Sequence, residues 1–223
     1  MIKKIIIVGI VLGVIAVGAI LLIPWGEYES TLEKSEIKEE VSVDSTGIVI
    51  PSLSLIQGKY FVESGENSQA ELLFDVEGLQ ATKGAFEQFN IEFDITEDYT
   101  RSTLIVEIQA ATINTGNDMR DEHLADEDFF NSAEFPIIRF ESSSIGQTDT
   151  AYIATGDLTL LSESNTINIP FKHLGSGTNK EEIAFEAFEG TFVFDRTEYG
   201  MEEVSGAGNV VTINFYCELV VEG

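Results

Sequence analysis

The chain has 223 residues, long enough for one domain that buries a core without help from a metal or a disulfide. Its 39 acidic and 12 basic residues give a formal net charge of −27. This balance argues against nucleic-acid binding, because phosphate contacts need clustered lysine and arginine, and it disfavours docking on an anionic membrane surface.

Residues 1–26 differ in kind from the rest of the chain. Lys3 and Lys4 precede an unbroken apolar run from Ile5 to Ile23. As a helix this run would be about 28 Å long, close to the roughly 30 Å hydrocarbon core of a bilayer. Trp25 follows at the position of a membrane interface. The segment is therefore predicted to be a transmembrane helix.

The end of the apolar run is a poor cleavage site, so the pattern favours an uncleaved anchor over a signal peptide. The two lysines place the rest of the chain on the periplasmic or extracytoplasmic side under the positive-inside rule. Gly9 and Gly13 form a Gly-x-x-x-Gly pattern, from which a homodimer contact within the membrane is a weak further expectation.

Residues 27–54 are predicted to be an acidic, partly flexible linker, rich in Glu, Lys and Ser and without a clear hydrophobic period. The Glu and Lys content favours a short helix over residues 31–40. Residues 55–223 form the remaining domain.

This domain is predicted to be all-β. Short segments of alternating polarity are separated by glycine-rich turns, and little of the sequence has a helical period. Such a pattern is typical of an antiparallel barrel or sandwich. The predicted strands are 58–64, 71–76, 84–86, 89–95, 102–109, 137–140, 152–161, 166–174, 182–195 and 209–221.

The alternation within these strands gives each one an apolar face. The residues predicted to share such faces are Leu72, Phe74 and Val76; Leu104, Val106 and Ile108; Phe192 and Phe194; and Val211, Ile213 and Phe215. Cys217, the single cysteine, is in register with the last set and is expected to be a small core side chain. Periodicity alone favours a filled core, although a barrel of about eight strands is also wide enough for one ligand.

Residues 113–142 are the one stretch in which the strand pattern turns helical. Residues 115–118 are turn and cap types, and an acid-rich segment with few apolar residues follows them. Pro136 ends any helix, and residues 137–140 return to a strand pattern. Two short helical turns between two strands are therefore predicted.

Four motifs follow one another here: Thr115-Gly116, Arg120-Asp121-x-His123-Leu124, Asp128-Phe129-Phe130 and Phe135-Pro136-x-Ile138-x-Phe140-x-Ser142. With the later segment Asp195-Arg196-Thr197-Glu198-Tyr199-Gly200-Met201, they resemble the signature of the YceI-like, polyisoprenoid-binding family. The similarity runs from about Gly58 to Leu219. It implies a lipocalin-like antiparallel barrel that holds a long apolar lipid, and so favours a ligand cavity over a solid core.

The candidate ligand-binding residues combine this implication with the one-sided strands. The expected lumen lining is Phe74, Val106, Phe192, Phe194, Ile213 and Phe215, and the pair Phe129 and Phe130 is expected to form a lid at the mouth. The expected ligand is an isoprenoid lipid, such as a polyisoprenoid or an isoprenoid quinone. No further cofactor is expected.

The polar residues of the motifs are predicted to have a structural role. Arg120, Asp121 and His123 are expected to form a buried network that holds the helical insert, and Arg196 is expected to pair with a carboxylate. His123 and His173 are the only histidines, and the chain lacks zinc-ligand spacing, an EF-hand loop, a Gly-x-Ser-x-Gly elbow and a P-loop. No metal site and no catalytic residue are predicted.

Three classes of function remain open at this point. The first is a non-enzymatic lipid-binding protein tethered outside the membrane. The second is an enzyme that acts on a lipid or small substrate through His123 and a nearby carboxylate. The third is a ligand-free envelope scaffold with a solid barrel. An apolar cavity without inward titratable groups would favour the first class, and a His–carboxylate pair opening into a cavity would favour the second.

Overall fold

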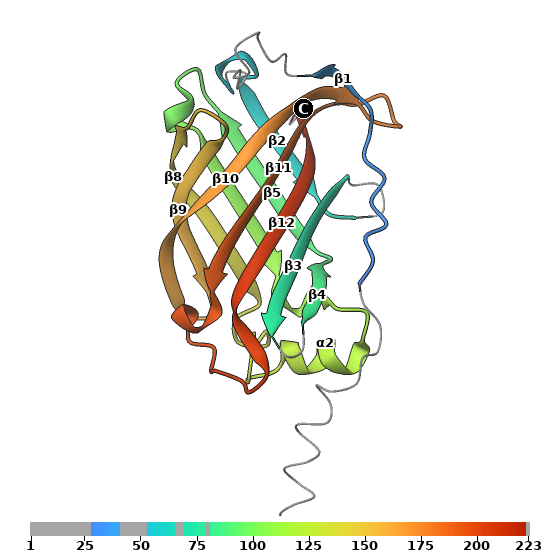
Figure 1. Ribbon diagram of the computed structural model, residues 1–223. Helices are drawn as coiled ribbons and strands as arrows, with labels where there is room; N and C mark the ends of the chain where they lie inside the picture. The colour runs from blue at the N-terminus through green and yellow to red at the C-terminus, as the bar shows by residue number, and fades with distance from the viewer. Residues whose placement is uncertain (1–27, 41–52, 66–68, 79–80, 222–223) are drawn as a thin grey trace, which may run out of the picture.

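The computed structural model describes residues 28–40, 53–65, 69–78 and 81–221 (Figure 1). The predicted transmembrane helix and its Gly-x-x-x-Gly pattern lie outside these residues. Among the residues that are described, no helix has both the length and the apolar character needed to span a bilayer.

Within the described ranges, eight antiparallel strands close into a barrel, and most strands pair with the next one along the chain. They are β2 (Gly58–Glu63), β5 (Phe89–Ile95), β6 (Thr103–Gln109), β8 (Ile137–Gln147), β9 (Tyr152–Leu160), β10 (Glu163–Thr178), β11 (Ala184–Asp195) and β12 (Ala207–Val221). This architecture confirms the predicted all-β, lipocalin-like barrel with a short helical insert.

On one side, β12 pairs with two different strands along its length. The last residues of β12 pair with β2, whereas the rest of β12 pairs with β3 (Ala70–Gly78). β4 (Thr82–Phe86) leads into β5, and β7 (Ile113–Asn114) follows β6 after a short 3₁₀ helix. β4 and β7 pair with each other and extend the wall below β5 and β6. The wall is therefore continuous along the length of β12.

The remaining helices are short. α2 (Asp118–Ala125) lies below the ends of β3 and β4, at the lower end of the barrel in Figure 1. The 3₁₀ helices are η1 (Leu53–Leu55), η2 (Tyr99–Arg101), η3 (Ala110–Thr112) and η4 (Arg196–Tyr199). The first predicted helical turn of the insert is confirmed as α2, while the second is a hydrogen-bonded turn over residues 127–130.

The predicted helix over residues 31–40 is wrong. Residues 28–40, here called the strap, run extended beside β3 on the outside of the barrel and end in β1 (Ile37–Glu40), which pairs with β10 (Figure 1). Leu32 and Ile37 pack on an outer cluster formed by Phe185, Ala187 and Tyr216. Burial of these two side chains against the wall outweighs the helical preference of the Glu and Lys residues between them.

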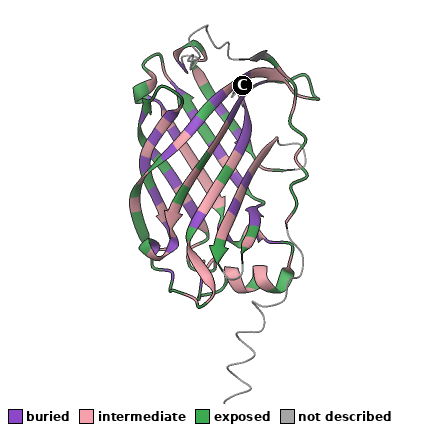
Figure 2. Cartoon of the chain, viewed as in Figure 1, coloured by how far each residue is buried: buried purple, intermediate pink, exposed green. Residues whose placement is uncertain are grey.

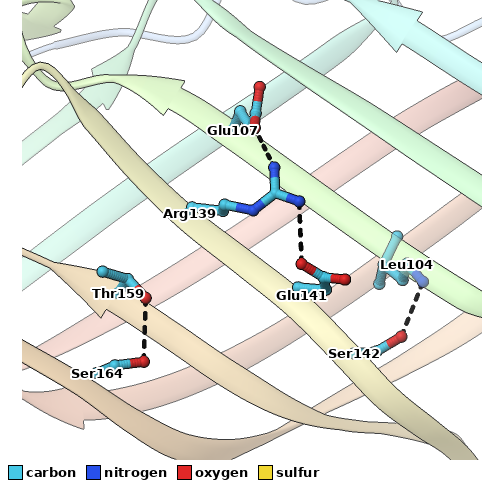
Figure 3. Close-up of polar contacts among 7 residues, drawn as sticks. All are labelled: Leu104, Glu107, Arg139, Glu141, Ser142, Thr159 and Ser164. Carbon is cyan, nitrogen blue, oxygen red and sulfur yellow. Dashed lines mark hydrogen bonds and ion pairs between the residues drawn. The ribbon is translucent and has the colours of Figure 1, made fainter.

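Burial alternates along the strands, as Figure 2 shows, because successive side chains point into and out of the barrel. A bulge at residues 142–144 of β8 interrupts this order. There the backbone N–H of Leu104 donates to the hydroxyl of Ser142 at 2.8 Å (Figure 3). A side chain at Gly156 would collide with the Glu141 carbonyl across the bulge, so glycine is needed there.

The outer face carries polar pairs between strands. Arg139 on β8 lies between Glu107 on β6 and Glu141 on its own strand, and its guanidinium contacts both carboxylates (Figure 3). Its hydrogen bond to Glu141 raises the pKa of Arg139. These side chains are more than a third exposed, so the pairs contribute little to stability.

The end of the barrel away from α2, here called the closed end, is filled with aromatic side chains. Tyr152 stacks on Phe171 at 5.5 Å between ring centroids, and Phe171 meets the edges of Phe93 and Phe188. Leu53 of η1 is fully buried there and donates its N–H to the Tyr152 hydroxyl. This end therefore has the close packing of an ordinary protein core.

Candidate functional site

Below the aromatic end, the barrel encloses an apolar cavity of about 190 Å³. One buried water needs only about 10–15 Å³ on the same scale, so this space is large enough for more than a few solvent molecules. Inward side chains from strands throughout the barrel line it, and the insert closes the end nearest α2. The cavity is here called the lumen.

All six wall residues predicted from strand alternation line the lumen. They are Phe74, Val106, Phe192, Phe194, Ile213 and Phe215. Except for Phe74, they are only half-buried although they point inward, because the centre of the barrel is not filled. Cys217 is buried in the core, as predicted, and also borders the lumen, and burial raises the pKa of its thiol to about 12.

Two glycines make room for aromatic rings in the wall. A side chain at Gly84 would collide with the Phe74 ring, and one at Gly190 would collide with the Phe215 ring. Each pair is directly opposed on neighbouring strands, Phe74 with Gly84 and Phe215 with Gly190. The rings therefore lie flat against the wall and leave the centre open.

The insert is tied to the barrel through Thr115, which is fully buried. Arg120 donates from Nε to the Thr115 hydroxyl at 2.8 Å and from the terminal nitrogen Nη2 to the Thr115 carbonyl at 2.9 Å. The Thr115 backbone N–H donates to the Asp121 carboxylate at 2.9 Å. Asn117 caps the helix by accepting from the Arg120 N–H. The predicted network thus exists for Arg120 and Asp121, but its centre is Thr115.

His123 lies at the lumen instead of at the centre of this network. Its ring meets the Phe129 ring edge to face at 5.3 Å, and its Nε2 is 3.6 Å from a carboxylate oxygen of the exposed Asp128. Phe129 and Phe130 both line the lumen, as the lid prediction requires, and Phe130 packs on Phe86 of β4. These contacts place the insert across the end of the lumen.

The predicted ion pair of Arg196 is wrong. Arg196 is buried, and its guanidinium donates to the backbone carbonyls of Gly208 and Glu202 and to the amide oxygen of Asn209. In the described part of the chain, no carboxylate lies within ion-pair distance of it. Burial lowers the pKa of Arg196. Oxygens of the loop between η4 and β12 and of the first residues of β12 satisfy the cation, so Arg196 ties that loop to the start of β12 at the edge of the lumen.

A second polar cluster lies near the closed end and was not predicted. His173 on β10 is buried, and its Nε2 is 2.7 Å from the Glu186 carboxylate, which also accepts from the Ser176 hydroxyl. The register of β10 with β11 brings these residues together across a bulge, which strand alternation alone does not reveal. Phe188, which lines the lumen, packs against the His173 ring with 5.1 Å between ring centroids and separates the cluster from the lumen.

Across the residues that the structure describes, His, Cys, Asp and Glu side chains do not gather into a group that could hold a metal ion. A closed antiparallel barrel with an apolar lumen and a helical cover defines a lipocalin-like binding fold.

Comparison with known proteins places the chain within that class. The model of the YceI-like domain family matches residues 64–219, well over half of the chain. A Staphylococcus aureus protein described as UPF0312 is 30% identical over 145 residues, which cover 61% of this chain and 80% of that protein. A UPF0312 protein of Shewanella denitrificans is 26% identical over 73% of this chain and 86% of that protein. The chain belongs to the YceI-like family.

Solved structures agree with this fold. BcnA of Burkholderia cenocepacia superposes with a TM-score of 0.59 at 21% identity, over 69% of this chain and 96% of BcnA. A domain from Saccharophagus degradans, described as polyisoprenoid-binding, superposes with a TM-score of 0.55 at 11% identity, over 74% of this chain and 99% of that domain. At these identities the likeness concerns the fold.

Proposed function

We propose that the lumen binds a long-chain isoprenoid lipid without turning it over. The observation that carries the proposal is the unfilled apolar lumen inside a barrel whose other end is tightly packed. Membership of the YceI-like family and the likeness to a domain described as polyisoprenoid-binding support it.

The physical argument concerns packing. Each fully buried apolar side chain contributes about 1.5–3 kcal/mol to folding, and half-buried inward residues such as Phe192 and Phe194 forgo part of that contribution. An apolar tail in the lumen would restore it, because the tail would meet these rings and exclude water. A branched isoprenoid chain needs no polar partner along most of its length, and the middle of the lumen is apolar.

His123 and Asp128 keep an enzymatic alternative in view, since they form a His–carboxylate pair beside the lumen. Their 3.6 Å separation is too long for a hydrogen bond, and Asp128 is exposed, so the two groups are not hydrogen-bonded in this structure. We assign His123 to the lumen wall because its ring lines the cavity and packs on Phe129. Incubating the chain with an isoprenoid lipid should leave the mass of the lipid unchanged; a product whose formation His123→Gln abolishes would favour an enzyme.

The proposed setting is extracytoplasmic, with residues 5–23 as a membrane anchor that keeps the barrel near its lipid source. The support is the apolar sequence and the preceding lysines. Sequencing the N-terminus of the mature protein tests the anchor, and a mature chain that begins near Glu27 would contradict the anchor and leave a secreted protein.

The lipid-binding proposal is tested by placing a charge in the lumen. Val106→Asp puts a carboxylate against the tail and should abolish retention of an isoprenoid lipid, because burying an unpaired charge beside a lipid is strongly unfavourable. Val193→Asp is the matched control, because Val193 points outward and is 61% exposed.

Both variants are compared with the wild-type chain for lipid retained after washing, measured by mass spectrometry, and for folding by circular dichroism. Equal retention by a folded Val106→Asp chain and the Val193→Asp chain would contradict binding in the lumen.

A further inference from the structure

The strap fixes the place on the barrel from which the N-terminal segment leaves. Its first residue, Tyr28, is half-buried, and burial together with the nearby carboxylates of Glu71 on β3 and Glu87 after β4 raises its pKa. The Ser30 hydroxyl donates to the Glu71 carboxylate. From there the strap rises past the side of β3 to β1 at the closed end (Figure 1). The strap therefore begins on the side of the barrel where β4 and α2 lie and ends at the opposite end.

Contacts along its whole length hold the strap in this position. Leu32 and Ile37 pack on the outer cluster, and the Ser35 N–H donates to the buried Glu218 carboxylate at 2.7 Å. At the upper end β1 pairs with β10, and Glu33 forms an ion pair with Lys180 at 2.8 Å. The apolar contacts and the strand pairing carry most of the attachment, because the ion pair is exposed. The place of Tyr28 on the barrel is therefore fixed.

The length of chain before the strap limits how the barrel can stand on a bilayer. In the proposed anchor, Trp25 takes the outer interface, and the chain from Trp25 to Tyr28 spans at most about 11 Å. From Tyr28 to Glu40 at the closed end, the extended strap covers roughly 40 Å. With its closed end facing the bilayer, the barrel would hold Tyr28 roughly that far from the interface, several times the reach of the tether. That orientation is excluded for an anchored chain with a docked strap.

We propose that the docked strap holds the barrel with its α2 end toward the bilayer, so that the insert faces the membrane surface. The inference rests on the proposed anchor and adds an orientation to it: a lipid that moves between the bilayer and the lumen meets the insert first. The tether and not charge brings this end close, because residues 118–134 hold seven carboxylates and one arginine, which anionic head groups repel.

The test measures how close each end of the barrel comes to the bilayer. The full chain, with a fluorophore on one introduced cysteine, is reconstituted in phosphatidylcholine vesicles that contain a lipid with a quencher on its head group. Glu127→Cys places the fluorophore on the insert, and Asp149→Cys places it at an exposed turn of the closed end. The wild-type chain, whose one cysteine is buried, gives the labelling background. Quenching should be several-fold stronger at position 127 than at position 149.

A matched pair of strap variants tests the cause. Leu32→Asp combined with Ile37→Asp places two carboxylates against the outer cluster and should release the strap, which lengthens the tether by up to roughly 40 Å. Quenching at position 127 should then fall several-fold, to about the level at position 149. Thr31→Asp combined with Glu36→Asp changes exposed neighbours in the strap and should leave the difference between the two ends as it is. Circular dichroism checks that each barrel is folded.

Flotation of the vesicles separates the anchor from the orientation. A chain that floats with the vesicles but is quenched equally at both ends, or more strongly at position 149, would keep the anchor and overturn the orientation. An unchanged difference in the folded Leu32 and Ile37 variant would overturn the role of the strap. A chain that does not float would overturn the anchor, and this inference with it. The lipid-binding proposal stands in each case, because it is tested in the lumen.

Discussion

Thr115 connects the barrel wall to the helical insert through a single buried side chain. It follows β7 directly, and its hydroxyl, N–H and carbonyl all take part in hydrogen bonds to Arg120 or Asp121. Because Thr115 is fully buried, water cannot replace these bonds when one of them is lost.

Thr115→Val keeps the shape of the side chain and removes the hydroxyl, which leaves Arg120 and Asp121 each short of one partner. The free energy of unfolding should fall by about 1–3 kcal/mol. Urea denaturation followed by circular dichroism measures the loss. Thr150→Val, at an exposed turn of the closed end, is the control and should change stability by less than about 0.5 kcal/mol. Equal effects of the two substitutions would show that the Thr115 network contributes little.

Cys217 makes stability depend on alkaline pH. Burial raises the pKa of its thiol to about 12, whereas an unfolded cysteine has a pKa of about 8.5. Between these values the unfolded chain releases a proton that the folded chain keeps, so stability is fully present below about pH 8.5 and is lost as pH rises toward 12.

Cys217→Ala removes this titration. The difference in unfolding free energy between the wild-type chain and the variant should therefore shrink by about 1 kcal/mol for each pH unit between roughly pH 9 and 11. Urea denaturation of both proteins at several pH values measures it, and the tyrosines that titrate in the same range contribute equally to both. If the difference in unfolding free energy stays constant from pH 8 to 11, the folded chain does not raise the pKa of the Cys217 thiol.

At the scale of elements, the strap attaches an extra layer to the outside of β11 and β12. Lys34 lies 3.9 Å from the centre of the Tyr216 ring, and the Ser35 N–H donates to the Glu218 carboxylate at 2.7 Å. Glu218 is buried beneath the strap and also accepts from the Tyr216 hydroxyl. The strap therefore supplies a hydrogen bond to a carboxylate that it covers.

A chain that begins at residue 36 lacks most of the strap and should melt several degrees lower than a chain that begins at residue 28. The loss follows from exposing the apolar cluster around Phe185 and Tyr216 and from removing the Ser35 N–H that donates to Glu218. Differential scanning calorimetry measures both chains under the same conditions. Coincident melting curves would mean that the strap does not stabilise the barrel.

Most of the barrel could be predicted because strand alternation is a local signal. The predicted strand 89–95 coincides with β5, and residues such as Val106 and Ile213 point into the lumen as their period requires. The strap could not be predicted in the same way. β1 is only four residues long, and its apolar partners, Phe185 and Tyr216, lie far away in the sequence.

The polar contacts of the site were harder to predict than its lining. Residue types point to ion pairs, and so the sequence suggested a carboxylate partner for Arg196. Its partners are instead two backbone carbonyls, of Glu202 in the loop and of Gly208 at the start of β12, whose positions depend on how the chain turns between η4 and β12. Thr115 was recognised only as a turn residue, because its role depends on which side chains fold back over it.

For the whole molecule, the barrel combines a packed end with a hollow one. The aromatic cluster and η1 fill the closed end. The insert lines the lumen at the other end, where α2 lies in Figure 1. Among the described residues, most carboxylates lie on the outer surface and in the segments around the insert, away from the apolar lining. This division separates the acidic side chains from the lumen in which a lipid is proposed to bind.

The central claim is that an isoprenoid lipid occupies the lumen, and mass spectrometry of the organic extract from the purified chain tests it most directly. The account predicts one isoprenoid lipid in near-equimolar amount with the wild-type chain and its loss from Val106→Asp. Recovery of no isoprenoid lipid, or of the same amount from both chains, would contradict it.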